Sequence, residues 1–190
     1  TNQTVSGLRP DLAVIADLIM PHARVLDIGC GDGALLGHLR QNKQVDGRGI
    51  EINQALVNQA IAKGIAVIQG DVDNDLSYYP SQAYDYVVLS QTLQAMRDPK
   101  SVLEQLVRIG RQAIVSVPNF GHWKNRLYLA LRGKMPVTKT LSYPWYDTPN
   151  IHFCTITDFV ALVEMLNITI EDRVVVDAHG HRTRFKGRGF

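Results

Sequence analysis

The chain has 190 residues, of which 45% are hydrophobic and 20% are charged, as in ordinary soluble globular domains. This composition excludes disordered, collagen-like and extended coiled-coil proteins, and the length suits one domain spanning residues 1–190. Lysine and arginine number 20 against 18 acidic residues, so the net charge of +2 gives no reason to expect nucleic acid or a membrane surface as a partner.

The two cysteines, Cys30 and Cys154, are far apart and have neither the spacing of zinc ligands nor the density of a disulfide scaffold. No apolar run reaches the roughly 18 to 20 residues of a membrane span, and the first twenty residues lack the features of a signal peptide. We therefore expect a protein of the reducing cytoplasm that does not bind a membrane.

Apolar spacing and capping residues predict helices that alternate with strands along most of the chain. The predicted helices are 8–20, 34–42, 53–64, 98–109, 121–132 and 155–166. Apolar runs bounded by glycine, proline or polar residues predict strands at 24–28, 49–52, 66–69, 84–90 and 112–117, and an extended run at 168–176.

The strand predicted at 84–90 is apolar enough to be covered on both faces, which favours an interior place in a sheet. Strands alternating with helices at short spacing predict an α/β fold with a doubly wound, mostly parallel sheet flanked by helices. Ligands of such sheets bind at the carboxyl ends of strands, so we expect the functional residues in the loops after the strands.

A glycine-rich loop follows the first predicted strand, where residues 27–33 have the sequence DIGCGDG and lead into a helix. Gly29 and Gly31, on either side of Cys30, allow a tight turn and a close approach of a ligand to the backbone, beside the free N–H groups of a helix start. A tight strand-to-helix turn without a ligand is the alternative interpretation of these glycines. The next features favour a ligand.

The spacing and charge of this loop point away from a dinucleotide. A dinucleotide fingerprint has the spacing G-x-G-x-x-G, whereas this loop has G-x-G-x-G. Asp27 and Asp32 are poor neighbours for a pyrophosphate but good ones for a cationic amino-acid group. The motif therefore predicts a nucleoside that carries an amino acid. Glu51, at the end of the second strand, would accept hydrogen bonds from both ribose hydroxyls, and Ile52 would pack on adenine.

Further polar residues follow the third and fourth strands. Asp71 would accept the exocyclic amine of adenine, the Val72 backbone N–H would bind a ring nitrogen, and Ser90 ends the fourth strand. Asp71 as a turn residue and Glu51 as a solvated strand end are the alternatives. Placement of all these residues at neighbouring strand ends favours one binding site.

These motifs resemble the class I S-adenosylmethionine-dependent methyltransferase family in the stretch 25–33, in Glu51, in Gly70 and Asp71, and in the strand 84–90. The resemblance implies a Rossmann-like fold and S-adenosylmethionine or S-adenosylhomocysteine as cofactor. It also implies a closing β-hairpin, yet the tail after Val176 is too basic for a buried strand. We therefore expect no strand within 177–190, either because the natural protein continues beyond Phe190 or because the final strand is absent.

Catalytic residues are not evident. Members of this family often have L-E-H-V-x-D-P after the fourth strand, whereas residues 93–99 have LQAMRDP, with Gln94 and Ala95 in place of the Glu-His pair. The chain thus lacks the obvious base there, although positioning alone can suffice for a nucleophilic acceptor. The lone His122 and His152 are more typical of structural residues, and His179 with His181 lacks a third metal ligand, so no metal site is predicted.

An unusual segment, 119–154, is expected to form an inserted helix and loop that cap the strand ends. Its helix is predicted to bury Trp123, Leu127 and Leu131, and long loops of this kind are often binding loops. No acidic residue lies between Gln105 and Tyr146, and the basic residues there are Arg108, Arg111, Lys124, Arg126, Arg132, Lys134 and Lys139. A solvated basic face and a protein interface are both compatible with this pattern, whereas no nucleic-acid motif is present.

The same segment resembles the bacterial methionine biosynthesis protein MetW family, in residues 119–123 (NFGHW), 132–139 (RGKMPVTK) and 145–152 (WYDTPNIH). The resemblance implies a protein that binds S-adenosylmethionine or S-adenosylhomocysteine and supports homoserine O-acyltransferase in methionine biosynthesis as an accessory subunit. The alternative is an active S-adenosylmethionine-dependent small-molecule methyltransferase.

Overall fold

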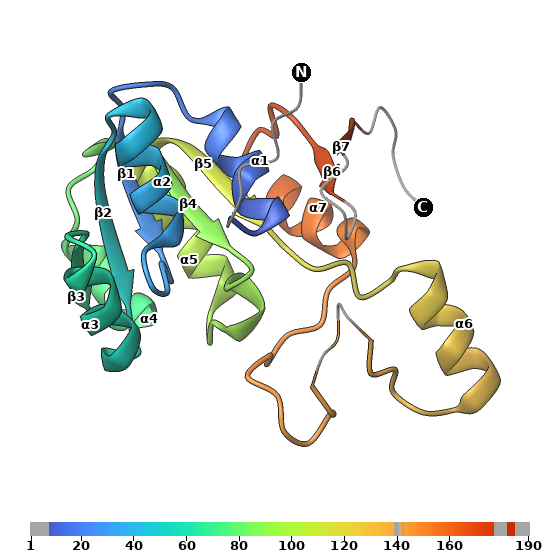
Figure 1. The fold of residues 1–190 in the computed structure, drawn as a ribbon. Coiled ribbons are helices and arrows are strands. Elements are labelled where there is room, and N and C mark those ends of the chain that lie inside the picture. The colour runs from blue at the N-terminus through green and yellow to red at the C-terminus, as the bar shows by residue number, and fades with distance from the viewer. Residues whose placement is uncertain (1–7, 139–140, 142, 177–181, 185–190) are drawn as a thin grey trace.

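A computed structural model describes residues 8–138, 141, 143–176 and 182–184. Its centre is a five-stranded sheet in the order β3-β2-β1-β4-β5, and all neighbouring strands are parallel (Figure 1). The strands are β1 (Arg24–Ile28), β2 (Asp46–Glu51), β3 (Ala66–Gln69), β4 (Tyr84–Ser90) and β5 (Gly110–Ser116). The parallel sheet and the interior place of β4 confirm the fold predicted from the sequence.

Helices connect successive strands and cover both faces of the sheet (Figure 1). The helices of the described residues are α1 (Pro10–Leu18), α2 (Ala34–Lys43), α3 (Gln54–Ala62), α4 (Val72–Asp75), α5 (Pro99–Ile109), α6 (Trp123–Arg132) and α7 (Ile156–Met165), of which α6 does not cover the sheet. The single turns α4, η1 (Leu76–Tyr78) and η2 (Leu93–Ala95) were not predicted, because one turn is too short to show helical periodicity. Each helix in the described part of the chain is too short or too polar to span a lipid bilayer.

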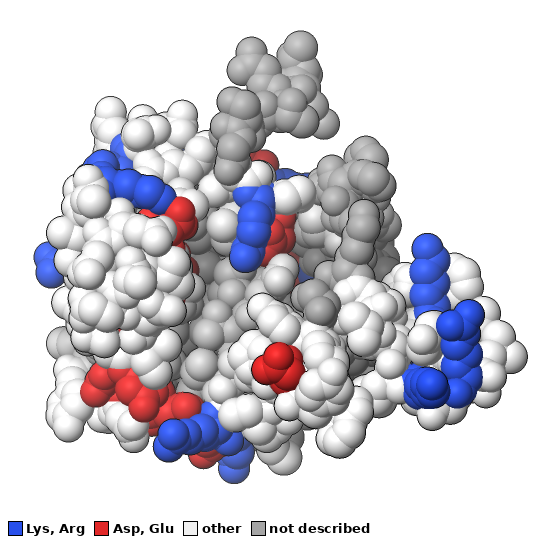
Figure 2. Space-filling model, turned by 60° about the horizontal axis from the view of Figure 1, so that its bottom comes forward, with Lys and Arg blue, Asp and Glu red and all other residues white. Residues whose placement is uncertain are grey.

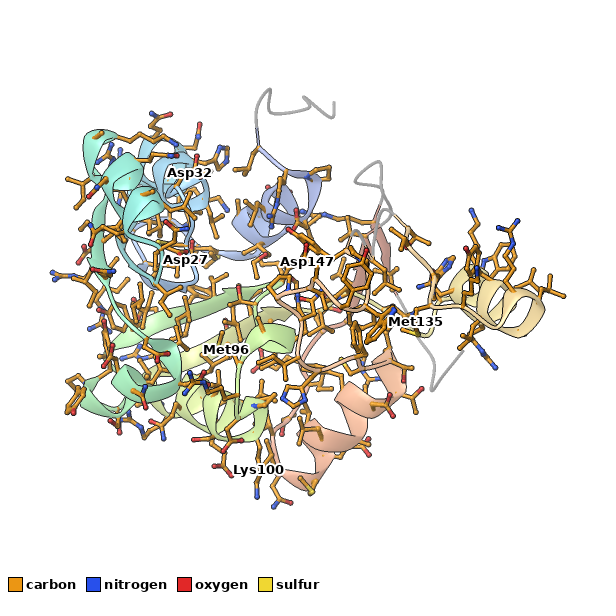
Figure 3. All side chains as sticks on the ribbon, turned by 90° about the horizontal axis from the view of Figure 1, so that it is seen from below. Asp27, Asp32, Met96, Lys100, Met135 and Asp147 are labelled. Atoms are coloured by element: carbon orange, nitrogen blue, oxygen red, sulfur yellow. The ribbon has the colours of Figure 1, made fainter. Side chains whose placement is uncertain are left out.

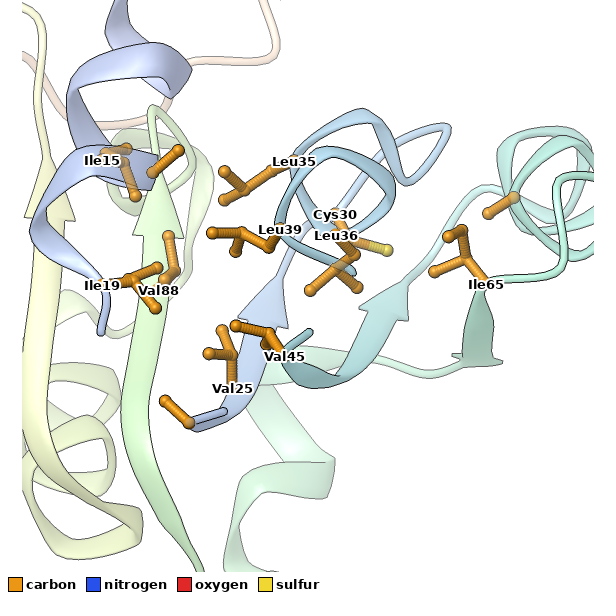
Figure 4. Close-up of a cluster of buried hydrophobic side chains, with 13 residues drawn as sticks. Ile15, Ile19, Val25, Cys30, Leu35, Leu36, Leu39, Val45, Ile65 and Val88 are labelled. Carbon is orange, nitrogen blue, oxygen red and sulfur yellow. The ribbon is translucent and has the colours of Figure 1, made fainter. Parts of the chain in front are cut away.

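Two hydrophobic cores lie on opposite faces of the sheet. One core joins the sheet to α1, α2 and α3 (Figure 4), and the other joins it to α5 and α7. Consecutive residues of β1 point to opposite cores, so Val25 packs in the first and Leu26 in the second. Both faces of the interior strands are therefore covered, which explains the nearly continuous apolar runs in the sequence.

Two predicted helix caps are present. The Asp98 side chain accepts a hydrogen bond from the Ser101 backbone N–H at 3.1 Å and begins α5. At α7 the Thr155 hydroxyl accepts from the Asp158 N–H at 3.2 Å, while the Asp158 carboxylate accepts from the Thr155 N–H at 2.9 Å. This reciprocal pair satisfies donors that a helix start otherwise leaves free.

The main sheet has no closing strand among the described residues, as expected, but the expectation that residues 177–190 form no strand at all was wrong. A short strand, β7 (Arg182–Arg184), pairs antiparallel with β6 (Val174–Val176) in a separate two-stranded sheet. A basic strand fits here because it does not enter the main sheet, and Arg182 forms an ion pair with Asp17 of α1. The expected extended run 168–176 contains only the three strand residues of β6.

The burial predicted for the helix of the inserted segment was also wrong. α6 forms where expected, but Trp123, Leu127 and Leu131 are all exposed. In Figure 1 this helix extends away from the sheet, so its periodic apolar residues do not reach either core.

Candidate functional site

A cavity of about 290 Å³ lies at the carboxyl ends of β1 and β4, with α1 and the start of α2 as further walls. Six of the residues predicted to bind the cofactor line it: Asp27, Gly29, Cys30, Gly31, Asp32 and Ser90. The remaining wall residues are Arg9, Leu12, Ala34 and Leu35. A cavity of this size is close to the range of small-molecule sites.

The glycine loop is held against the end of β2. The Gly29 and Cys30 N–H groups both donate to the Ile50 carbonyl, at 2.8 and 3.1 Å. Gly29 and Gly31 have φ values of +70° and +58°, which side chains rarely adopt. A Cβ at Gly29 would lie 2.8 Å from the Thr92 hydroxyl oxygen, whereas a Cβ at Gly31 would meet open space. Gly31 is therefore a point where a ligand could approach the backbone closely.

Glu51 fixes this loop from the neighbouring strand. Its side chain is 8% exposed, Oε2 accepts from the Gly31 N–H and Oε1 accepts from the Asn53 N–H, both at 2.9 Å. Each carboxylate oxygen can accept a second hydrogen bond. Glu51 does not line the cavity itself, but its bond to Gly31 places it directly behind the cavity wall.

Asp27 is the buried acid of the cavity. It is 3% exposed, and burial raises its pKa to about 7, with the negative charge of Glu51 adding to the rise and the positive charge of Arg9 opposing it. At neutral pH the side chain is therefore divided between its neutral and charged forms. Figure 3 labels Asp27 together with Asp32, the second acid of the motif.

Asp32 is held in an ion pair. Lys63 of the turn after α3 donates to its carboxylate, and this hydrogen bond lowers the pKa of Asp32. The other carboxylate oxygen accepts from the Ala34 N–H at 3.3 Å. The two acids of the loop are thus not equivalent, because Asp32 has a cationic partner in the protein and Asp27 has no ion-pair partner among the described residues.

The start of α1 forms a wall that sequence reasoning missed. Arg9 and Asp11 form an ion pair at 2.8 Å, and Asp11 also accepts from the Gln91 side chain at 2.9 Å and from the Ser90 hydroxyl at 3.4 Å. Arg9 and Asp11 precede the first strand by many positions and belong to no motif. Only the tertiary packing of α1 on β4 brings them to the cavity.

Ile52, Asp71 and Val72 do not line this cavity. Ile52 is exposed, and the Asp71 carboxylate caps α4 by accepting from the Asp73 N–H at 3.1 Å. Val72 is buried and lines a second cavity of about 390 Å³, between α4 and the start of α5. Their contacts with adenine stay predictions.

The position of the missing Glu-His pair is occupied by a buried glutamine. Gln94 donates from Nε2 to the Gln91 carbonyl at 2.6 Å, while its Oε1 has no hydrogen-bond partner among the described residues. The Gln94 carbonyl accepts from the N–H groups of Ile151 and His152, at 2.8 and 2.9 Å. The segment 119–154 therefore returns to the loop after β4, beside the cavity.

His122 and the Cys30 thiol show no catalytic features in this fold. The His122 ring accepts from the Lys124 N–H and caps α6. Burial, with lesser contributions from Asp27 and Glu51, raises the pKa of Cys30 to about 12, so its thiol is not a nucleophile at neutral pH. His179 and His181 lie outside the described residues, and among the described residues no three His, Cys, Asp or Glu side chains are grouped as metal ligands.

Solved structures show the same fold. S-adenosylmethionine-dependent methyltransferases from Archaeoglobus fulgidus and Thermotoga maritima each align with a TM-score of 0.66, at 16% and 17% identity. The alignments cover 87% and 95% of this chain and 69% and 83% of those proteins. At such identities the similarity establishes the fold and no more.

Relatives found by sequence similarity narrow the group of proteins to which the chain is similar. The bifunctional methionine biosynthesis protein MetXA/MetW of Rhodopirellula baltica is 33% identical over 179 residues, which are 90% of this chain and 29% of the relative. The ubiquinone biosynthesis O-methyltransferase of Photorhabdus laumondii is 36% identical over 104 residues, 50% of this chain and 43% of the relative. The chain thus spans less than half the length of either relative.

The family model of the methionine biosynthesis protein MetW matches residues 9–188, nearly the whole chain. The match includes the glycine loop, the residues around Gln94 and the inserted segment with α6. The chain therefore belongs to the methionine biosynthesis protein MetW family, and its domain has the fold of the S-adenosylmethionine-dependent methyltransferases.

Proposed function

We propose that the chain binds S-adenosylmethionine or S-adenosylhomocysteine beside the glycine loop and supports homoserine O-acyltransferase as an accessory subunit in methionine biosynthesis. The observation that carries nucleoside binding is the pair of buried carboxylates, Asp27 and Glu51, at the ends of adjacent strands. Neither forms an ion pair within the described part of the chain. Because buried charge is costly without partners, a ligand with an ammonium group and two hydroxyls would stabilise this site.

The residues present divide between the two ends of such a ligand. Asp27 and the open backbone at Gly31 suit the amino-acid end, and Glu51 has acceptor capacity left for ribose hydroxyls. Ser90 and Arg9 offer further polar groups on the same cavity wall. Arg9 suits a ligand carboxylate, because a guanidinium pairs well with that group.

Nucleoside binding is tested by mass spectrometry of ligand released from the purified protein and by calorimetry with S-adenosylhomocysteine. Replacement of Glu51 by alanine should weaken binding at least about tenfold, because two hydroxyls lose a charged acceptor. Asp71→Ala is the matched control, and a smaller loss is expected because its carboxylate already caps α4. Unchanged affinity of Glu51→Ala would remove Glu51 from the site.

The acyltransferase partner is supported by the relative from Rhodopirellula baltica, whose name joins MetXA and MetW in one bifunctional protein. Joining two proteins raises their effective concentration, which is useful where the two act together. The bound nucleoside would then report the state of the methionine pathway by changing the affinity for the partner, a coupling of typically 1 to 3 kcal/mol. Co-purification with the acyltransferase, with and without nucleoside, tests the association, and no complex in either condition would refute it.

An active methyltransferase is the second candidate, favoured by the names of relatives such as the ubiquinone biosynthesis O-methyltransferase. The absence of the Glu-His pair at Gln94 and Ala95 weighs against it, since no base replaces it there. Incubation with labelled S-adenosylmethionine and a metabolite extract distinguishes the two candidates. A labelled small molecule would support the methyltransferase, and no labelled product would support the accessory subunit.

A further inference from the structure

α6 carries an apolar stripe that nothing in the described structure covers. Trp123, Leu127 and Leu131 follow one another at intervals of four residues, so they share one face of the helix. Their exposed fractions are 61%, 49% and 76%. Amphipathic helices normally bury such a stripe against their own core, and exposed apolar patches mark interaction sites.

The base of the inserted segment holds α6 in this outward position. The Phe120 N–H donates to the Cys154 carbonyl at 3.3 Å, and the rings of Phe120 and Phe153 meet edge to face with 4.8 Å between centroids. The buried Asn125 side chain donates to the Phe120 carbonyl at 3.3 Å and ties the first turn of α6 to this base. The two ends of the inserted segment therefore contact each other where the segment leaves and rejoins the domain, and α6 extends outward from there (Figure 1).

Positive charge surrounds the apolar stripe. Lys124 lies over the Trp123 ring at 5.6 Å, and Arg132 lies over the Tyr128 ring at 5.1 Å. The sequence from Gln105 to Tyr146 contains no acidic residue, and Figure 2 shows lysine and arginine on the extending part of the molecule. A surface that fits this helix must therefore offer an apolar groove with acidic side chains at its rim.

Two basic residues of the same sequence run do not belong to this surface. Arg108 donates to the carbonyls of Leu76 and Tyr79, at 2.9 and 2.7 Å, and so supports the packing of α5. Arg111 lies 3.8 Å from Asp85 at the start of β4. Among the basic residues of this run that the structure describes, those left for the surface are Lys124, Arg126 and Arg132 of α6 and Lys134 just after it.

We propose that α6 is the docking helix for homoserine acyltransferase, with its apolar stripe in an acid-rimmed groove of that enzyme. The inference rests on the proposed function, because the joined MetXA/MetW relative supplies the partner. A second copy of this chain fits poorly, since a two-fold contact through α6 would bring its lysines and arginines together. Tryptophan and arginine are also the residue types that most often dominate binding energy at protein interfaces.

The test is a binding titration between the full chain and the purified acyltransferase of the same organism. Leu127→Ser and Trp123→Ala should each weaken binding at least about tenfold, as expected for central interface residues. Ile61→Ser is the matched control, because Ile61 on α3 is 54% exposed and α3 lies at the other end of the molecule (Figure 1). This control should change the affinity less than about twofold.

A charge-reversal variant tests the contribution of the basic residues to binding separately from that of the apolar stripe. Lys124→Glu should slow association with the acyltransferase, and the effect should shrink in high salt, whereas Lys100→Glu on α5 should change little. Urea unfolding of every variant establishes that the fold is intact.

The outcomes separate the docking surface from the proposed function. Binding of the acyltransferase by the wild type and equally by the α6 variants would overturn the docking helix and leave the accessory function standing. No binding by the wild type would overturn both. Sedimentation of the chain alone completes the test, because a dimer that only the α6 variants dissociate, with acyltransferase binding unchanged, would assign α6 to a second copy and overturn the proposal.

Discussion

Asp27 makes the stability of the domain depend on pH. Its pKa rises from 3.8 to about 7 on folding, so between these values the folded chain keeps a proton that the unfolded chain releases. The free energy of unfolding therefore falls as the pH rises through this window and levels off above it. Over the whole window, this pKa shift lowers the free energy of unfolding by roughly 4 kcal/mol.

The variant Asp27→Asn tests this pH dependence, because an asparagine side chain does not titrate. Relative to the wild type, the variant should gain stability as the pH rises from about 5 to about 8, because only the wild type then carries a buried charge. Urea unfolding at both pH values measures the difference. An identical pH dependence in the two proteins would show that Asp27 does not titrate in this window.

Gly29 and Gly31 offer a comparison because both have a positive φ. Alanine at either position adopts a positive φ at a cost of about 1 to 2 kcal/mol. Gly29→Ala should cost more, because its Cβ would also lie 2.8 Å from the Thr92 hydroxyl oxygen. Urea unfolding of the two variants tests the order, and a larger loss for Gly31→Ala would contradict the packing described for the loop.

Site residues that belong to a continuous motif can be predicted from the sequence, whereas residues that only tertiary packing brings to the site cannot. Six predicted residues line the cavity because five of them belong to one continuous motif at the end of β1 and Ser90 ends an adjacent strand. Arg9 and Leu12 reach the same cavity only through the packing of α1, for which no local pattern exists. The ion pair of Asp32 with Lys63 is likewise a contact between distant residues.

The start of α7 is stabilised by a capping box that two side chains form, those of Thr155 and Asp158. Thr155→Ala should lower the free energy of unfolding by about 1 kcal/mol, because the Asp158 N–H loses its acceptor. Thr157→Ala, at an exposed position of the same helix, should change it by less than about 0.5 kcal/mol. Thermal or urea unfolding compares the pair, and equal effects would show that the cap contributes little.

α6 shows what helical periodicity does and does not predict. The spacing of Trp123, Leu127 and Leu131 correctly predicts a helix with an apolar face, but periodicity does not say which surface covers that face. The far end of the same segment contacts the Gln94 carbonyl through Ile151 and His152. The inserted segment thus contains both the exposed helix and residues that contact the loop beside the cavity.

At the scale of the whole molecule, the alternation of strands and helices predicts the sheet well because each βαβ unit is local in sequence. The C-terminal part was predicted less well. Within the described residues β7 pairs with β6 and not with the main sheet, and its sequence of three residues is too short and too polar to show an apolar periodicity. A short strand with basic residues resembles a solvated tail when only the sequence is considered.

The role proposed for this methyltransferase-like domain is the support of a homoserine acyltransferase. The most direct measurement is the rate of homoserine acylation by the purified acyltransferase while this chain is titrated into the assay. An accessory subunit predicts a rate that rises and then saturates near equal molar amounts of the two proteins. A rate that stays constant over the whole titration, with and without S-adenosylmethionine, would contradict the claim.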